Sequence, residues 1–136
     1  MKVVVDTNVF LSGLFFKGSP RVLYLAWTDG AFVGVLTSEI LNEYRRATTN
    51  FLGVDRDPQI EEALQLVLAN SVLIDAPPLP RPICRDHDDD KFIACALHGN
   101  ADCIVSGDKD LRVLHGRIPV PVLEPRQFLA QLHAGT

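Results

Sequence analysis

Near its start the chain reads Val3-Val4-Val5-Asp6-Thr7-Asn8-Val9, a β-branched run that stops at three polar residues. A short, continuous apolar run predicts a buried strand, and Asp-Thr-Asn predicts that a helix starts directly after it. The first strand is therefore expected to end at Asp6.

The rest of the chain alternates between the same two kinds of segment. Further strands are expected at residues 32–36, 72–74, 103–105 and 120–123. Helices are expected at residues 9–16, 20–27, 38–48, 58–70 and 90–98, after Asp108, and from Pro125 onward. This alternation predicts an α/β fold, a three-layer α/β/α sandwich with a central parallel sheet of four to five strands.

Composition restricts the class of protein. A length of 136 residues predicts one domain, and 47% hydrophobic with 22% charged residues is typical of a globular protein. Asp6 and Asn8 interrupt the apolar run that a secretory signal needs, and no segment reaches the ~20 apolar residues of a spanning helix. A cytoplasmic protein with no membrane association is therefore expected. Cys95 and Cys103 are expected to be buried apolar side chains rather than disulfide or zinc ligands.

Four acidic residues form the candidate site. Asp6 and Asp108 each follow an apolar strand, and ligands of open parallel sheets bind beyond the carboxyl ends of the strands. Glu43 borders the buried face of the helix at 38–48, and Asp90 opens the helix at 90–98 where it meets the core. Helix capping or solvation is the common explanation for each such acid by itself, and it is the interpretation given to the neighbours Asp86, Asp88 and Asp89.

The chemistry of these acids indicates a divalent metal. Two carboxylates that project from one sheet edge repel each other unless a cation joins them, and oxygen ligands without a His or Cys cluster suit Mg²⁺ or Mn²⁺. Such ions activate water for phosphodiester hydrolysis. The net charge of −4 argues against a nucleic-acid ligand at first, but without the four site acids 13 acidic residues remain against 13 Lys and Arg. The excess of negative charge is thus attributable to the site.

Four segments in order resemble those of PIN-domain proteins, especially the bacterial and archaeal toxin components that include VapC-type toxins. The first is the opening run already quoted. The others read Ser38-Glu39-Ile40-Leu41-Asn42-Glu43-Tyr44, Arg85-Asp86-His87-Asp88-Asp89-Asp90-Lys91-Phe92-Ile93-Ala94 and Val105-Ser106-Gly107-Asp108-Lys109-Asp110-Leu111. The resemblance covers nearly the whole chain, and it implies a single PIN-like nuclease domain over residues 1–136. His87 and Ser106 depart from the proline and threonine that are frequent in relatives, but neither removes a carboxylate.

The resemblance implies that Asp6, Glu43, Asp90 and Asp108 are the catalytic acids of a Mg²⁺- or Mn²⁺-dependent ribonuclease. Metal would be held chiefly by Asp6, Asp90 and Asp108. Glu43 would bind metal through water or position the attacking water. Supporting or alternative positions are Asn8, Ser106 and Asp110, the last as a rival to Asp108.

The resemblance also implies partners. These are an RNA substrate, a small antitoxin protein that blocks the site, and a second copy of the chain in a homodimer or higher oligomer. The candidate RNA contacts are Arg45, Arg46, Arg85, Lys91 and Lys109, for which surface solvation is the alternative interpretation.

Two other interpretations stay open. The opening strand and Asp-Thr-Asn resemble the start of a haloacid-dehalogenase-like phosphatase, although Asn8 stands where such enzymes need a second Asp. A receiver domain would need a phospho-acceptor after its central strand, for which Asp75 is the candidate. A non-enzymatic alternative is a PIN-like RNA-binding or protein-interaction module whose acids serve only as caps.

Overall fold

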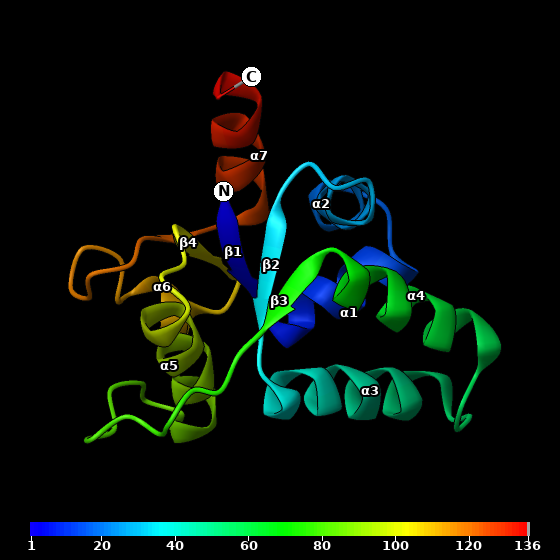
Figure 1. Ribbon diagram of the computed structural model, residues 1–136, viewed down its shortest axis with the longest axis horizontal. Helices are drawn as coiled ribbons and strands as arrows, with labels where there is room; N and C mark the ends of the chain where they lie inside the picture. The colour runs from blue at the N-terminus through cyan, green and yellow to red at the C-terminus, as the bar shows by residue number, and fades with distance from the viewer. Residues whose placement is uncertain (136) are drawn as a thin grey trace.

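The computed structural model describes residues 1–135 and contains one parallel sheet (Figure 1). Its strands are β1 (Lys2–Val5), β2 (Val33–Leu36), β3 (Ser71–Leu73), β4 (Cys103–Val105) and β5 (Val122–Leu123). They lie in the order β3-β2-β1-β4-β5, and every neighbouring pair is parallel. The predicted α/β fold with a parallel sheet of up to five strands is confirmed.

Helices lie on both sides of this sheet. They are α1 (Thr7–Phe15), α2 (Ser19–Thr28), α3 (Ser38–Leu52), α4 (Pro58–Ala69), α5 (Asp90–His98), α6 (Lys109–Arg112) and α7 (Pro125–Ala134), with a 3₁₀ turn, η1 (His87–Asp89), before α5. Figure 1 shows α5 on one side of the central strands and α1, α2 and α4 on the other. The sandwich therefore has the three predicted layers. Among residues 1–135, no helix is both long and apolar enough to cross a membrane.

The central strands form the middle of the core. Val3, Val4 and Val5 are fully buried, as the uninterrupted apolar run predicts for a strand covered on both faces. Cys84, Cys95 and Cys103 are buried free thiols, which confirms the expectation for the last two. Burial raises the pKa of Cys95 and of Cys103 to about 12, so both stay protonated and behave as small apolar side chains.

Polar side chains follow three of the strands at the same edge of the sheet. Asp6 ends β1 and caps α1 by accepting a hydrogen bond from the Val9 N–H at 2.8 Å. Thr37 ends β2 and caps α3 through the Ile40 N–H at 3.2 Å, and Ser106 ends β4. The chain passes from β1 outward to β3 and then returns to place β4 beside β1, so the strand order reverses between β1 and β4. This is the point at which open parallel sheets form a ligand-binding crevice.

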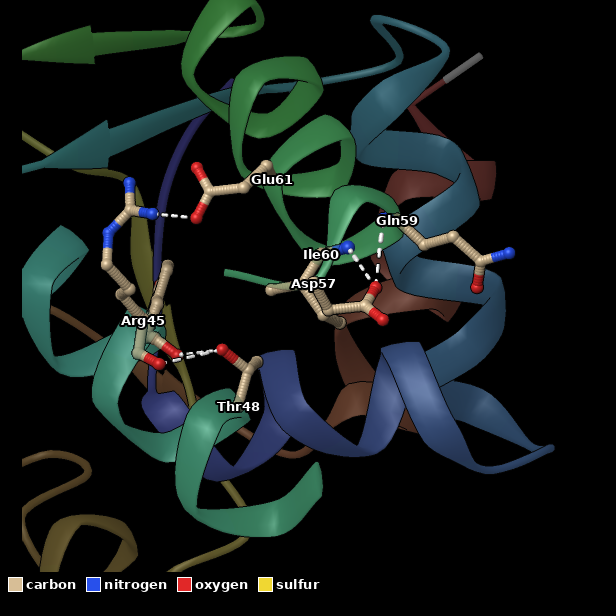
Figure 2. A network of polar contacts seen from close by, with 7 residues as sticks. Arg45, Thr48, Asp57, Gln59, Ile60 and Glu61 are labelled. Atoms are coloured by element: carbon tan, nitrogen blue, oxygen red, sulfur yellow. Dashed lines mark hydrogen bonds and ion pairs between the residues drawn. The ribbon is translucent and has the colours of Figure 1, made fainter. Parts of the chain in front are cut away.

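A network of polar contacts lies on α3 and the first turns of α4 (Figure 2). Arg45 of α3 makes an ion pair with Glu61 of α4. Asp57 caps α4 by accepting hydrogen bonds from the N–H groups of Gln59 and Ile60, at 2.9 and 3.2 Å. The Thr48 hydroxyl bonds to carbonyls of its own helix. The Arg45–Glu61 ion pair therefore joins α3 to α4, and the other contacts stabilise each helix by itself.

Candidate active site

A pocket of about 450 Å³ lies at the carboxyl edge of the sheet, between the start of α1, the helix α3, η1 and the turn after β4. Six acidic side chains line this acid pocket, namely Asp6, Glu43, Asp86, Asp88, Asp89 and Asp108. Its other lining residues are Thr7, Asn8, Arg46, Ala47, Asn50 and Phe92. The structure therefore brings three of the four predicted acids, Asp6, Glu43 and Asp108, to one place.

Asp6 is the most buried of these acids, with 4% of its surface exposed. One carboxylate oxygen caps α1, and the other accepts a hydrogen bond from the Ser106 hydroxyl. Burial raises the pKa of Asp6 from 3.8 to about 6; these two hydrogen bonds oppose the rise, and the charges of Asp108 and Glu43 add to it. The Asp6 carboxyl is thus held rigidly in a place that disfavours its negative charge.

Ser106 joins Asp6 to Asp108. Its fully buried hydroxyl donates to Asp6 and accepts from the Asp108 N–H at 2.9 Å. Asp108 in turn caps α6 through the Asp110 N–H at 2.9 Å. Asp110 does not line the acid pocket but faces an adjoining cleft. Between the two candidates after β4, the geometry places Asp108 with Asp6, and Ser106 has the supporting position that was expected.

Glu43 reaches the pocket from α3 and is held by two partners. It accepts a hydrogen bond from the Thr7 hydroxyl and forms an ion pair with Lys91 of α5, which also pairs with Asp88 at 3.0 Å. The Lys91 side chain is only 7% exposed. Burial by itself would lower the pKa of Lys91, but the hydrogen bonds to Glu43 and Asp88 hold that pKa above its ordinary value. Lys91 therefore serves as an internal counter-charge to Glu43.

The Asp-rich run before α5 is where the structure differs from the expectation. Asp90 does not line the acid pocket. Its carboxylate accepts hydrogen bonds from the backbone N–H of Cys84 at 2.7 Å and of Ile83 at 3.2 Å, and it borders a separate hollow with Glu39 and Ala94. Asp90 is thus occupied in holding the preceding loop.

Asp89 lies in the acid pocket in place of Asp90. It stands at the N-cap position of α5 but makes no capping hydrogen bond, and its Oδ2 atom is buried without a hydrogen-bond partner among the described residues. Burial raises the pKa of Asp89 to about 7, with the negative charges of Asp108 and Asp86 adding to the effect. Asp89 therefore has the N-cap position that was expected but not the capping hydrogen bond, whereas Asp86 does cap η1 through the Asp88 N–H.

Helical spacing groups Asp89 and Asp90 with different neighbours, but it does not by itself tell which of the two faces meets the acid pocket. Residues three apart lie on one face of a helix, so Asp89 shares a face with Phe92, and both line the acid pocket. Asp90 shares a face with Ala94, which is four residues on, and both border the other hollow.

The basic residues proposed to contact RNA do not line a single hollow. Arg46 lines the acid pocket and Lys109 lines the adjoining cleft. Arg45 and Lys91 are engaged in the ion pairs with Glu61 and Glu43. Arg85 is exposed and lines neither hollow. Asn8 is exposed and lines both of them.

The chemistry of the acid pocket fits a hard divalent cation. All its candidate ligands are oxygens, the Asp89 Oδ2 atom has no hydrogen-bond partner in the described part of the chain, and burial beside other carboxylates raises the pKa values of Asp6 and Asp89. Within residues 1–135, no three His, Cys, Asp or Glu side chains are yet arranged to hold a metal together. Ser106 and Lys91 occupy oxygens of Asp6 and Glu43, so a cation would have to draw the carboxylates together.

Comparison with known proteins agrees with this geometry. The model of the PIN domain family matches residues 2–110. An uncharacterized protein of Methanocaldococcus jannaschii, MJ1680, is 32% identical over 146 residues, which cover 96% of this chain and 91% of that protein. PIN domains are generally nucleases of the hydrolase type and typically use a divalent metal. With its parallel sheet, its acids at the strand ends and this match, the chain belongs to the PIN domain family.

Proposed function

We propose that the protein is a Mg²⁺- or Mn²⁺-dependent endoribonuclease that hydrolyses RNA phosphodiester bonds with water as the nucleophile. The observation that carries this proposal is the meeting of Asp6, Glu43, Asp89 and Asp108 in one pocket. These residues come from four separate segments, and Asp89 makes no capping hydrogen bond and has one carboxylate oxygen, Oδ2, without a partner within residues 1–135. A cap-only role therefore does not explain the cluster.

The acids have different roles in this proposal. Asp6, Asp89 and Asp108 would hold the cation, and Ser106 keeps Asp6 and Asp108 at a fixed separation. When bound, a divalent ion lowers the pKa of water and stabilises charge on the phosphoryl oxygens. Glu43 would accept a hydrogen bond from the attacking water, and Lys91 holds it in place. Asp90, which was expected to bind metal, would act on the site only through the loop it supports.

The test is cleavage of single-stranded RNA by the purified protein, with Mg²⁺ or Mn²⁺ and with EDTA. Asp6→Asn and Asp89→Asn are compared with the parent and with Asp55→Asn, which removes an exposed acid that does not line the pocket. We expect metal-dependent cleavage by the parent and Asp55→Asn and its loss in the two site variants. Equal cleavage by all four proteins would show that the activity does not come from this pocket. RNA binding without cleavage under any condition would favour the non-catalytic module.

The biological role proposed with this activity is that of the toxin in a toxin–antitoxin pair. It includes a small protein that covers the acid pocket and a homodimeric assembly. Growth arrest on expression of the parent but not of Asp6→Asn would support the toxin role. Sedimentation velocity would give the oligomeric state, and a monomer at all concentrations would contradict the dimer.

A further inference from the structure

A second hollow, an open cleft of about 1180 Å³, adjoins the acid pocket. The two hollows share Asn8 and Asp108, so they meet at the start of α1 and the turn after β4. From there the cleft extends along the turn into α2 and the start of α7. Its volume exceeds the ~300–1,000 Å³ of small-molecule pockets, which suits a segment of polymer. We call it the basic cleft because three cations line it, Lys17, Lys109 and Arg126.

The charges of the basic cleft are available to a ligand. Lys17, Lys109 and Arg126 are exposed, and none of them makes an ion pair with a residue that the structure describes. Of the three acids on the cleft wall, Glu124 is paired with Arg112 at 2.6 Å. The two acids without an ion pair to any described residue are Asp108, which the cleft shares with the acid pocket, and Asp110. Three unpaired cations therefore face two unpaired acids, which leaves a small excess of positive charge beside a strongly negative pocket.

The start of α2 adds to this positive character. Gly18, Ser19 and Pro20 line the cleft at the N-terminus of a helix of ten residues. Gly18 has a φ of +115°, which favours glycine, and offers no side chain to cap the helix. The partial positive charge at this helix end is thus uncompensated by any side-chain cap and lies beside Lys17.

We propose that the basic cleft binds the sugar–phosphate backbone of single-stranded RNA on one side of the bond that is cut in the acid pocket. This inference rests on the proposed ribonuclease function. The acid pocket repels phosphates except where a cation neutralises it, so affinity for the strand has to come from a neighbouring surface. The basic cleft meets the acid pocket at Asn8 and Asp108 and offers three exposed cations without ion-pair partners among the described residues.

The experiment measures binding of a fluorescent single-stranded RNA of about 12 nucleotides by anisotropy, in EDTA so that no metal-dependent cleavage occurs. The test variant is Lys17→Ala/Arg126→Ala, which removes two cleft cations and leaves the acids intact. The matched control, Lys2→Ala/Arg117→Ala, removes two exposed cations that line neither hollow. Each protein is titrated between 50 and 200 mM salt, and kcat and KM for RNA are measured with Mn²⁺.

We expect the test variant to bind about tenfold more weakly and to lose about 1.4 from the slope of log affinity against log salt, since each phosphate contact on a single strand contributes ~0.7. Its KM should rise with kcat unchanged, while the control should match the parent. Binding of the test variant within twofold of the parent, or no RNA binding by the parent, would overturn the inference. Cleavage by the parent together with unchanged binding by the test variant would reject the basic cleft and leave the ribonuclease function standing. The expected binding loss without any cleavage by the parent would support RNA binding in the basic cleft and reject the ribonuclease function.

Discussion

At the scale of single residues, the clearest contrast is between Asp89 and Asp90. Both are carboxylates at the start of α5, but Asp90 accepts hydrogen bonds from two backbone N–H groups and Asp89 accepts none as a cap. A carboxylate whose oxygens accept backbone hydrogen bonds stabilises a loop, whereas a carboxylate oxygen that is buried without a partner destabilises the fold and is available to a ligand. The two residues are therefore expected to affect different properties of the protein.

Truncating each residue tests this difference. Asp90→Ala should lower the free energy of unfolding by about 1–3 kcal/mol, since it leaves the N–H groups of Ile83 and Cys84 unpaired. Asp89→Ala should leave stability unchanged or higher and reduce kcat for RNA by roughly 100-fold or more, as for loss of a key electrostatic group. Urea denaturation and cleavage kinetics measure the two effects. The reverse pattern would restore Asp90 as the metal ligand.

Asp6 leads to a prediction on pH and stability. Its pKa is about 6 in the folded protein and 3.8 as an ordinary carboxyl, so the folded state holds the proton more tightly. The resulting destabilisation is absent below pH 4, develops between pH 4 and 6 and is complete above pH 6. We expect Asp6→Asn to stabilise the metal-free protein by up to about 2–3 kcal/mol at pH 8, and much less at pH 4. Urea denaturation in EDTA at both pH values measures this, and a pH-independent effect would contradict it.

At the scale of elements, two contacts set how the helices meet the sheet. Glu43, which lines the acid pocket, and Lys91 connect α3 to α5. On the other side, Gly34 of β2 lets Trp27 of α2 pack directly on the strand and donate a hydrogen bond to Ser71 at 3.1 Å. The first contact shapes the site, and the second fixes the layer that carries α2.

The ion pair is expected to have a large effect on stability. Lys91→Met should destabilise the metal-free protein by about 3 kcal/mol, since it leaves the Glu43 charge largely buried and without its cation. Lys91→Met/Glu43→Gln should recover part of this loss because the uncompensated charge is gone. Urea denaturation of the single and double variants gives the coupling energy. A double variant as unstable as the sum of both single variants would mean that the pair is not coupled.

The close packing of Trp27 against Gly34 of β2 is tested by adding a methyl group at Gly34. A Cβ at Gly34 would lie 2.5 Å from the Trp27 ring and from the Ser71 hydroxyl, so one of them must move. Gly34→Ala should cost about 1–3 kcal/mol and shift the fluorescence of Trp27, the sole tryptophan. Gly107→Ala is the matched control, because its Cβ would meet no atom within 4 Å. Equal stability of the two variants would contradict this packing.

At the scale of the whole molecule, charge is distributed unevenly around the reversal point of the sheet. The acid pocket gathers six carboxylates, whereas the adjoining cleft carries three unpaired cations. Burial and the neighbouring carboxylates raise the pKa values of Asp6 and Asp89 in this arrangement. A divalent cation that binds in the acid pocket should therefore raise the free energy of unfolding of the protein as well as support its activity.

The melting temperature should show this coupling. Mg²⁺ or Mn²⁺ at about 100 times its dissociation constant contributes ~2.7 kcal/mol, which corresponds to a rise of several degrees. The rise should be larger at pH 8 than at pH 5, because protons compete for Asp6 and Asp89 below their pKa values of about 6 and 7. Differential scanning calorimetry of the parent and Asp6→Asn/Asp89→Asn measures it. A rise of equal size in the double variant would place the cation elsewhere.

The sequence by itself determined the order of strands and helices, the buried β1 and the convergence of Asp6 and Asp108. Apolar periodicity and chain direction are local properties, and parallel strands necessarily bring their carboxyl ends to one edge. Tertiary structure alone decided between Asp89 and Asp90, because successive helical residues point about 100° apart and only packing sets the rotation of α5. It likewise turned Lys91 inward to Glu43 and assembled the basic cleft from segments distant in the chain, since both depend on contacts that no local pattern encodes.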